Sequence, residues 1–244
     1  MPRLSVSVII PTYNRRELVQ MAIDSVLGQT YQDFELIVVD DGSSDGTGQA
    51  LAKYGDRIKY LYQENAGESA ARQQGVEYAR GDLLAFLDSD DIWLPEKLAR
   101  QIDVLLAHPE SGFVYCWACT INGAGEDTRL LPLGYGIDLV GKNIGQLLEN
   151  NFIVAPGSSL VVKRNAYDAI DGFDHTIQFA EDWDFCLRLA SRYPFACLPI
   201  PLLQVRLHKR GWLQQRKNLE RMLQDHLYII DKFVQNTSMR LDTL

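Results

Sequence analysis

The sequence has little of several features that mark whole classes of protein. Its four cysteines, in a chain of 244 residues, are too few for the disulfide framework of a small secreted scaffold. No stretch reaches the roughly 20 apolar residues that a transmembrane helix needs. Basic residues are in the minority, with 24 Lys and Arg against 32 Asp and Glu, and the net charge is −8. Because a nucleic-acid-binding protein needs a basic face for the phosphates, we expect no nucleic-acid partner.

Two phosphate-binding motifs are missing as well. The P-loop pattern G-x-x-x-x-G-K-[ST] does not occur, which excludes a P-loop NTPase. The loop after the first predicted strand, PTYNRR (11–16), has no glycine, whereas a dinucleotide-dependent oxidoreductase needs G-x-G-x-x-G there. If an acidic chain without these motifs binds an anionic ligand, a cation must mediate the contact.

The two ends of the sequence give expectations about location. Residues 1–16 contain only a short apolar run and lack the pattern of a signal peptide, so we predict a cytoplasmic protein. Residues 213–244 are predicted to form an amphipathic helical tail. The residues near its apolar face are Leu219, Leu223, Leu227 and Ile230. Packing of this helix on its own domain is favoured, and peripheral contact with the inner face of a membrane or with a partner stays open.

Strand-like and helix-like segments alternate along the first half of the chain. The predicted strands cover residues 4–11, 34–40, 58–63, 82–88 and 112–120. The predicted helices cover residues 15–29, 46–55, 67–80 and 95–109. This alternation, with continuously apolar strands, predicts an α/β fold with a Rossmann-like, mostly parallel central sheet and helices on both faces.

The second half is less regular and is predicted to be mixed. Its predicted helices cover residues 143–151, 164–171 and 181–193, and a strand covers residues 158–164. Residues 195–208 are strand-like but interrupted by Pro199 and Pro201. Cys116 and Cys119 have C-x-x-C spacing but point to opposite faces of a predicted strand, which favours a structural role. We predict a single domain over residues 1–212, followed by the tail.

Polar loops follow the first four predicted strands. Ligands of open parallel sheets bind beyond the carboxyl ends of the strands, so these loops are expected to form one site. Asp40 and Asp41 stand side by side in the second loop, where a base or ribose with N–H or hydroxyl donors would satisfy them. The alternative is an Asx-rich turn.

Two acidic clusters are candidates for chemistry. Asp88 and Asp90 form a D-x-D pair after an apolar strand, and both carboxylates can reach one ion there. Mg²⁺ and Mn²⁺ bind one or two carboxylates together with ligand phosphates. The alternative is an acidic turn before the next helix. Glu181 and Asp182, at a predicted helix start, either complement the helix dipole or supply a general base.

Five motifs, in this order, resemble those of glycosyltransferase family 2: VSVIIPTYNR, ELIVVDDGSSDGT, ENAGESAARQQG, AFLDSDDIW and DGFDHTIQFAEDWDFCLRL. The resemblance covers about residues 4–210. It implies a GT-A fold with a nucleotide-sugar-binding half, residues 1–120, and an acceptor-binding half, residues 121–212. It also implies a metal-dependent enzyme that moves a sugar from a nucleotide-sugar donor, with uridine as the expected base. The expected acceptor is a hydroxyl of a saccharide or lipid-linked saccharide, and the anomeric carbon is inverted.

The resemblance assigns roles to single residues. Asp182 is the implied base that deprotonates the acceptor hydroxyl. Asp90 is the implied main ligand of Mn²⁺ or Mg²⁺, with Asp88 and His208 as further ligands. Asp91 is a weaker candidate. The residues expected to bind the acceptor are Glu181 and Trp183. The residues expected to bind the nucleotide-sugar are Pro11, Thr12, Tyr13, Arg15, Asp40, Asp41, Arg72, Asp88 and Ser89.

Within that set, Tyr13 is expected to stack on the base and Asp41 to accept a hydrogen bond from a base N–H. Trp93 is expected to pack beneath the D-x-D loop. Two other functions stay open, namely a catalytically inactive sugar-nucleotide-binding module and, less favoured, a nucleotidyltransferase. The presence of both the D-x-D pair and the Glu181–Asp182 pair favours the enzyme.

Overall fold

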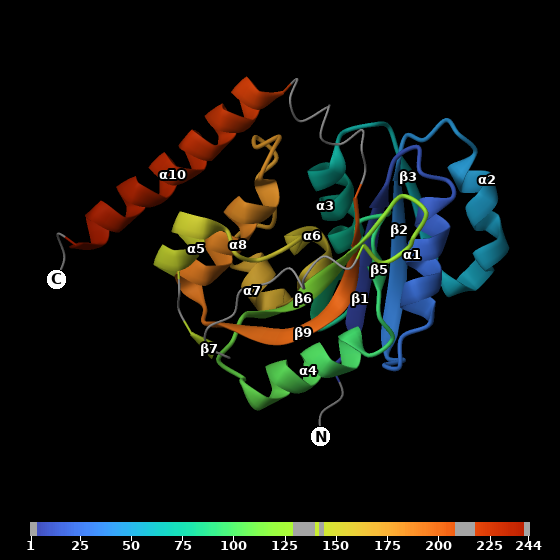
Figure 1. Ribbon diagram of the computed structural model, residues 1–244, viewed down its shortest axis with the longest axis horizontal. Helices are drawn as coiled ribbons and strands as arrows, with labels where there is room; N and C mark the ends of the chain where they lie inside the picture. Colours follow the sequence, from blue (N-terminus) through green and yellow to red (C-terminus); the bar gives the residue numbers. More distant parts are fainter. Residues whose placement is uncertain (1–3, 129–139, 142–143, 208–217, 242–244) are drawn as a thin grey trace.

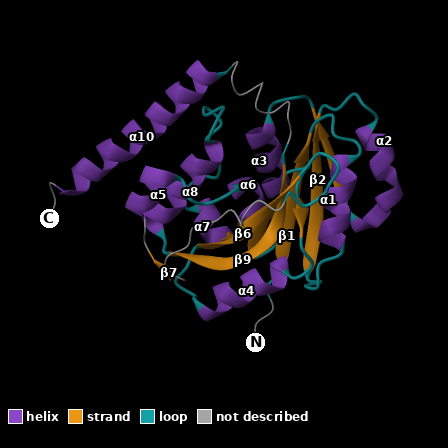
Figure 2. Cartoon of the chain, in the orientation of Figure 1, coloured by secondary structure: helices purple, strands orange, loops and turns teal. Residues whose placement is uncertain are grey.

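The protein is described by a computed structural model, in which residues 4–128, 140–141, 144–207 and 218–241 are placed. Within these residues the strands form a nine-stranded sheet in the order β3-β2-β1-β4-β8-β6-β9-β5, with β7 paired to β9. Figure 2 shows a twisted sheet with helices on both of its faces.

The strands are β1 (Val6–Thr12), β2 (Phe34–Asp41), β3 (Lys59–Gln63), β4 (Leu83–Phe86), β5 (Ile92–Trp93), β6 (Phe113–Ile121), β7 (Val140–Gly141), β8 (Leu160–Lys163) and β9 (Phe195–Arg206). The helices are α1 (Leu18–Leu27), α2 (Thr47–Leu51), α3 (Glu68–Tyr78), α4 (Lys97–Ala107), α5 (Ile144–Asn150), α6 (Pro156–Ser159), α7 (Arg164–Asp168), α8 (Glu181–Arg192) and α10 (Leu219–Leu241). A 3-10 helix, η1 (Ala52–Arg57), follows α2.

The alternation of side chains along β1 divides the core into two layers. Ile9 belongs to the cluster under α3, α7 and α8, whereas Val8 and Ile10 belong to the cluster under α1, α2 and α4. Successive residues of a strand point to opposite faces, so a strand covered on both sides must be apolar throughout. This explains the continuous apolar run that the sequence shows at β1.

The predicted α/β fold is confirmed. β1, β2, β3 and β4 pair in parallel, as do β6 and β9, and these ladders contain most of the paired residues. β8 runs antiparallel between β4 and β6. The carboxyl ends of β1, β2 and β4 therefore lie on one edge of the sheet, where the polar loops meet.

The sequence predicts a strand over residues 195–208 that two prolines interrupt, and the structure differs. β9 is one strand, and Pro199 and Pro201 do not end it. Its pairing with β6 moves from Cys116 opposite Leu198 to Trp117 opposite Pro201, so two residues bulge out of the ladder. A bulge accepts proline because the missing N–H has no ladder partner to lose there.

The tail helix α10 lies along the outside of the molecule, as Figure 1 shows in red. Ile229 and Phe233 are buried in the core cluster that includes α8. The predicted leucine face is not the packing face, because Leu219, Leu223 and Leu227 are 65%, 59% and 56% exposed. Among the placed residues, no helix combines the length and apolarity that crossing a membrane requires.

A charge contact fixes α10 on the domain. Lys232 Nζ lies 2.9 Å from Asp184 Oδ1 and 2.9 Å from Asp174 Oδ2, and the side chain of Asp184 is fully buried. Asp184 also pairs with Arg188, whose Nε lies 2.6 Å from Asp184 Oδ2, so the loss of Lys232 removes one of the cations that compensate this carboxylate. Breaking one contact of a buried charge network is destabilising, because the charges that remain are less well compensated.

We therefore predict that Lys232→Met, which keeps the apolar stem, lowers the free energy of unfolding by about 2 kcal/mol. Urea denaturation measures this change. Arg100→Met is the matched control, because Arg100 and its partner Glu96 are both more than half exposed, and it should change the value by less than about 0.5 kcal/mol. Equal effects of the two substitutions would contradict the role given to Lys232.

Candidate active site

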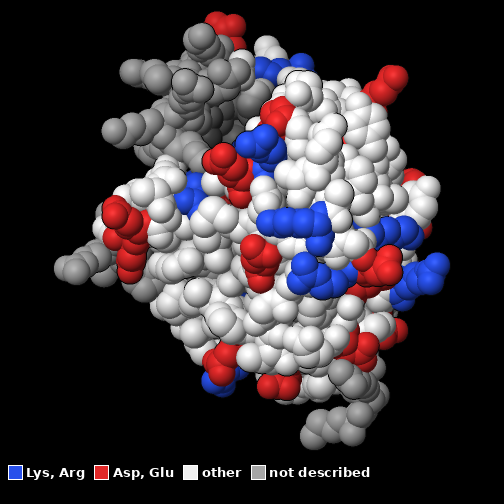
Figure 3. Space-filling view, turned by 90° about the vertical axis from the view of Figure 1, so that its right-hand side faces the viewer, with Lys and Arg blue, Asp and Glu red and all other residues white. Residues whose placement is uncertain are grey.

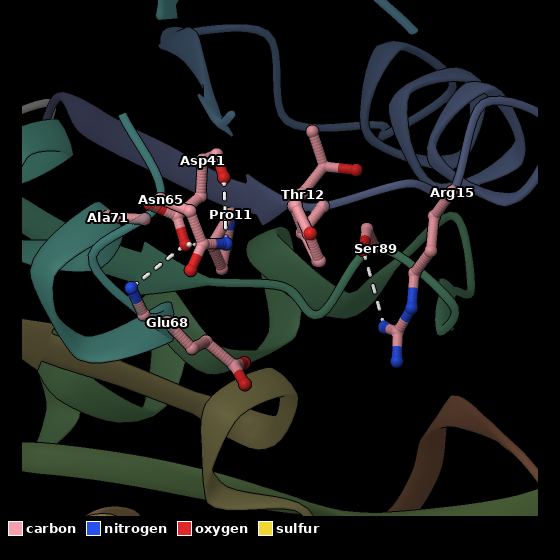
Figure 4. Close-up of a pocket in the computed structure, with 10 residues that line it drawn as sticks. Pro11, Thr12, Arg15, Asp41, Asn65, Glu68, Ala71 and Ser89 are labelled. Carbon is pink, nitrogen blue, oxygen red and sulfur yellow. Dashed lines mark hydrogen bonds between the residues drawn. The ribbon is translucent and has the colours of Figure 1, made fainter. Parts of the chain in front are cut away.

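A cavity of about 340 Å³ opens beyond the carboxyl ends of β1 and β2. Its lining residues are Pro11, Thr12, Tyr13, Arg15, Asp41, Asn65, Gly67, Glu68, Ala71 and Ser89. Figure 4 shows Asp41 and Asn65 at one end of the cavity and Arg15 and Ser89 at the other, with Thr12 between them. The four polar loops therefore converge, and the volume lies in the range of small-molecule sites.

Asp41 holds one end of the cavity together through hydrogen bonds from the loop that follows β3. Its Oδ1 accepts hydrogen bonds from Gln63 Nε2 at 2.6 Å and Ala66 N at 2.8 Å. Its Oδ2 accepts from Gly67 N at 2.9 Å and Asn65 Nδ2 at 3.2 Å. A carboxylate has about four acceptor positions, so all are occupied by the protein itself. Asp41 therefore shapes the loop at this end of the cavity, and its contact with a base N–H stays a prediction.

Asp40 is likewise structural. Its Oδ1 accepts from Ser43 N at 2.8 Å, and its Oδ2 accepts from Tyr60 Oη at 2.7 Å. The first two loops are then joined by Asn14, whose Oδ1 accepts from Ser44 N at 2.8 Å. Asn14 has a φ of +50°, a conformation that asparagine tolerates better than most residues. The turn interpretation of the second loop is therefore correct.

Thr12 and Tyr13 offer the free groups of the cavity. Thr12 is 3% exposed, and its Oγ1 has no hydrogen-bond partner among the placed residues. The ring of Tyr13 is 50% exposed at the mouth. A buried hydroxyl without a partner is costly unless a ligand satisfies it.

The D-x-D carboxylates point toward two arginines. Asp90 Oδ1 lies 2.7 Å from Arg15 Nη1, which also donates to Ser89 Oγ at 3.3 Å. Asp88 Oδ1 lies 2.7 Å from Arg72 Nη2. The side chains of Asp88 and Asp90 keep 27% and 13% exposure, and each contacts an arginine next to a cavity-lining residue or in the lining itself. The repulsion between these acids is thus offset by one cation each.

Asp91, the third acid of the loop, is an anchor. Its Oδ2 accepts from Ser158 Oγ at 2.7 Å, and its Oδ1 accepts from Arg206 N at 3.1 Å. Arg206 Nε also donates to the Asp90 carbonyl at 3.1 Å. Burial raises the pKa of Asp91 to about 8, and the charges of Asp88 and Asp90 add to the rise. Asp91 ties the loop to α6 and β9. Both of its carboxylate oxygens are bonded to the protein, which favours a structural role over metal binding.

Arg72 is the centre of the acidic cluster. It does not line the cavity itself but contacts Glu68, which does, so its place near the nucleotide stays a prediction. It is 2% exposed. Besides Asp88 it contacts Glu68 through Nη2, and its Nη1 lies 3.2 Å from Glu181 Oε1. Its guanidinium carbon lies 5.2 Å from the ring centroid of Phe173.

Asp182 follows Glu181 in the first turn of α8. Its Oδ1 accepts from Trp183 N at 2.7 Å. Burial raises the pKa of Asp182 to about 7, and the charge of Glu181 contributes in the same direction while Arg72 opposes it. A helix N-terminus alone would lower this pKa, so the buried, acidic surroundings supply the opposing influence that a base near neutral pH needs.

Trp183, Trp93 and His208 are also assigned roles from the sequence. Trp183, expected at the acceptor, is 4% exposed, and its Nε1 donates to the Leu147 carbonyl at 3.0 Å. A buried indole offers no open face to a sugar, which corrects that expectation. Trp93 packs as predicted, with 2% exposure and a bond from Nε1 to the Ser158 carbonyl at 2.9 Å. His208 lies outside the described residues.

Acidic and basic side chains lie side by side over the face seen in Figure 3. The basic groups on this face therefore have acidic neighbours.

The sheet order, with a parallel half joined to a mixed half and a cavity at the carboxyl ends of β1 and β2, defines a fold of the GT-A type. The family model of glycosyl transferase family 2 matches residues 7–170, and the chain belongs to this family.

Curated relatives agree with this assignment. An uncharacterized glycosyltransferase of Rickettsia typhi is 32% identical over 194 residues, which is 77% of this chain and 60% of that protein. The Escherichia coli UDP-Glc:alpha-D-GlcNAc-diphosphoundecaprenol beta-1,3-glucosyltransferase WfgD is 46% identical over 112 residues, 45% of this chain and 44% of that protein. The chain thus spans 60% or less of the length of these relatives.

Solved structures share the fold at lower identity. S. aureus TarS 1-349 in complex with UDP-GlcNAc has a TM-score of 0.70 and 21% identity, and covers 84% of this chain and 59% of that chain. The mannosyltransferase PcManGT from Pyrobaculum calidifontis, in complex with GDP-Man and Mn²⁺, has a TM-score of 0.67 and 23% identity. That match covers 92% of this chain and 63% of that chain.

The raised pKa of Asp91 predicts a pH dependence of stability. A carboxyl whose pKa rises from 3.8 in the unfolded chain to about 8 in the folded one contributes stability at low pH, and this contribution is lost as the pH rises through 8. We predict that, with cations removed by chelator, the free energy of unfolding falls between pH 6 and pH 9.

The Asp91→Asn variant should lose less stability over the same range, because its amide cannot ionise and can still bond Ser158 and Arg206 N. Urea titrations at four pH values measure both proteins. Parallel pH profiles would show that Asp91 does not carry the dependence.

Proposed function

We propose that the chain is an inverting, cation-dependent glycosyltransferase that moves a sugar from a UDP-sugar to a hydroxyl of a saccharide or lipid-linked acceptor. One observation carries the proposal. Asp88 of the D-x-D pair and Glu181 of the Glu181–Asp182 pair, far apart in the sequence, both contact Arg72 beside a cavity at the strand ends. A structural role alone does not require two acidic clusters to converge on one cavity.

The donor is proposed to lie in the cavity with its base between Tyr13 and the loop that Asp41 holds. Thr12 Oγ1 is the group available to hydrogen-bond the base or ribose, because it has no partner among the placed residues. Arg15, at the other end, is placed to contact the diphosphate. The fold neighbour TarS is described in complex with UDP and with UDP-GlcNAc, which supports uridine as the first base to examine.

The residues present fit a divalent cation. The placed residues hold no group of three or more His, Cys, Asp or Glu side chains suited to a metal. Asp88 and Asp90 nevertheless provide two hard oxygen donors beside the cavity, and Mg²⁺ or Mn²⁺ completes its shell with waters and ligand phosphates. Asp90 and Asp88 would hold the cation. When bound, the cation would neutralise charge on the leaving diphosphate.

The acid–base step belongs to Asp182. In a direct displacement the acceptor oxygen bonds to the anomeric carbon, the bond from that carbon to the diphosphate oxygen breaks, and the hydroxyl proton passes to the Asp182 carboxylate. Attack opposite the leaving group inverts the anomeric centre. A pKa of about 7 leaves a substantial fraction of this carboxyl ionised at neutral pH while keeping it basic enough to take a proton.

The acceptor and location follow from the relatives as proposals. WfgD is named as acting on a sugar linked to diphosphoundecaprenol, which supports a lipid-linked saccharide acceptor for this chain. We propose a cytoplasmic location with peripheral contact at the inner face of the membrane, where such an acceptor would be met. The exposed leucines of α10 are the candidate contact residues.

We predict that Asp182→Asn lowers kcat by about 10³-fold, because the amide cannot accept the proton, while donor affinity changes little. Transfer assays with a panel of UDP-sugars and isothermal titration with UDP and Mn²⁺ measure the two effects. Glu110→Gln, at an exposed position remote from the cavity, is the control with wild-type kcat. A variant Asp182→Asn that transfers sugar normally would refute the assignment of the base.

We predict that Asp90→Asn weakens cation-dependent donor binding by at least about 10-fold, because it removes a charged oxygen ligand. A thermal-shift series compares UDP with and without Mn²⁺, since a ligand that binds only the folded state raises the melting temperature. The cation-dependent part of the shift should disappear in the variant. If it stays unchanged, Asp90 does not hold the cation.

A further inference from the structure

Arg72 joins two segments that have different proposed tasks. Its Nη2 contacts Asp88, which follows β4 on the donor side, and its Nη1 contacts Glu181, which begins α8 on the acceptor side. A guanidinium is a planar fork with several donors, so it can hold two carboxylates at once in fixed directions. The distance from the donor-side loop to the first turn of α8 is thereby set by one rigid group.

The guanidinium itself cannot move far. Phe173 covers it, with 5.2 Å from the guanidinium carbon to the ring centroid. The backbone of α6 approaches closely at Gly157, where a side-chain Cβ would lie 2.6 Å from Arg72 Nη2 and 2.8 Å from Asp88 Oδ1. A Cβ is not accommodated at such distances, so the glycine allows α6 to press on the contact between Arg72 and Asp88.

The start of α8 depends on help from outside the helix. Its N-cap residue, Ala180, has φ +63° and ψ +25°, a left-handed conformation that is unfavourable for a residue with a Cβ atom. No side chain caps the helix from that position. Glu181, in the first turn, instead reaches Arg72. The ion pair therefore holds the turn from which Asp182 projects.

Resting on the proposed function, we propose that Glu181 is a positioning residue which, through Arg72, couples the donor-side carboxylate Asp88 to the aim of the base Asp182. Glu181 was expected from the sequence to bind the acceptor. The structure gives its carboxylate a protein partner and keeps its side chain 16% exposed. A ligand bound next to Asp88 would act on the first turn of α8 through the same contacts, and the position of Glu181 would in turn affect how that ligand binds.

Kinetics separate positioning from acceptor binding. Glu181→Gln should lower kcat by about 10- to 100-fold, the scale of a small misplacement of a catalytic group, with both KM values within threefold of wild type. Arg72→Lys should lower kcat as well. The kcat of the double variant should be less than about twofold below that of Arg72→Lys alone, because the two residues act through one contact.

Glu35→Gln is the control. Its carboxylate bonds Ser7 Oγ and Arg80 N at the opposite end of the sheet, and its kcat should be unchanged.

A second measurement does not depend on turnover. The chain has four tryptophans, so 5-fluorotryptophan labelling gives four ¹⁹F resonances, and Trp183→Phe assigns the one next to Asp182. Adding MgCl₂ and UDP should shift the Trp183 resonance in the wild type. In the Glu181→Gln variant this ligand-induced shift should be less than half of the wild-type value. Circular dichroism checks that the variant is folded.

The outcomes are distinct. A raised acceptor KM with unchanged kcat in Glu181→Gln would show direct acceptor binding and overturn the inference. The inference would also be overturned if Glu181→Gln had the kinetic constants of the wild type, or if MgCl₂ and UDP shifted its Trp183 resonance as far as in the wild type. If the wild-type chain transfers no sugar from any nucleotide-sugar, the proposed function fails, and the Trp183 shift alone then decides whether the two segments are coupled.

Discussion

The site depends on one buried positive charge. Arg72 faces Glu68, Asp88 and Glu181, and without it these three carboxylates from separate segments would repel one another. Arginine suits this position because its charge persists when buried and its fork matches several carboxylates. The donor-side loop and the start of α8 are thus held together by electrostatics, while the two apolar layers on either side of the sheet hold the strands that carry them.

Within the acidic loop, neighbouring aspartates have different tasks because their surroundings differ. Asp88 and Asp90 keep partial exposure and meet arginines, whereas Asp91 is buried and bonded to α6 and β9. The anchor fixes the loop, and the fixed loop presents the other two carboxylates to the cavity. This run of acidic residues is tolerated because Asp88 and Asp90 each face an arginine and because burial raises the pKa of Asp91.

Much of the fold could be predicted from local patterns. The apolar run at β1 indicates a strand buried on both faces, and the acids after β4 mark the edge where ligands bind. The antiparallel insertion of β8 could not be predicted, because strand order depends on pairing between distant segments. The four bonds to Asp41 come from residues more than twenty positions away, and the burial of Trp183 depends on α5. Such contacts leave no periodic signal in the sequence.

The four hydrogen bonds that the Asp41 carboxylate accepts affect the energetics of ligand binding. The loop at residues 65–67 is already ordered by the protein, so a ligand that enters beside it spends little of its interaction energy on freezing backbone. Binding should then show a modest heat-capacity change, set by the apolar surface of the ligand alone rather than by coupled folding. In the proposed donor complex, such an ordered pocket would discriminate among bases by the shape around Tyr13 and by the single hydroxyl of Thr12.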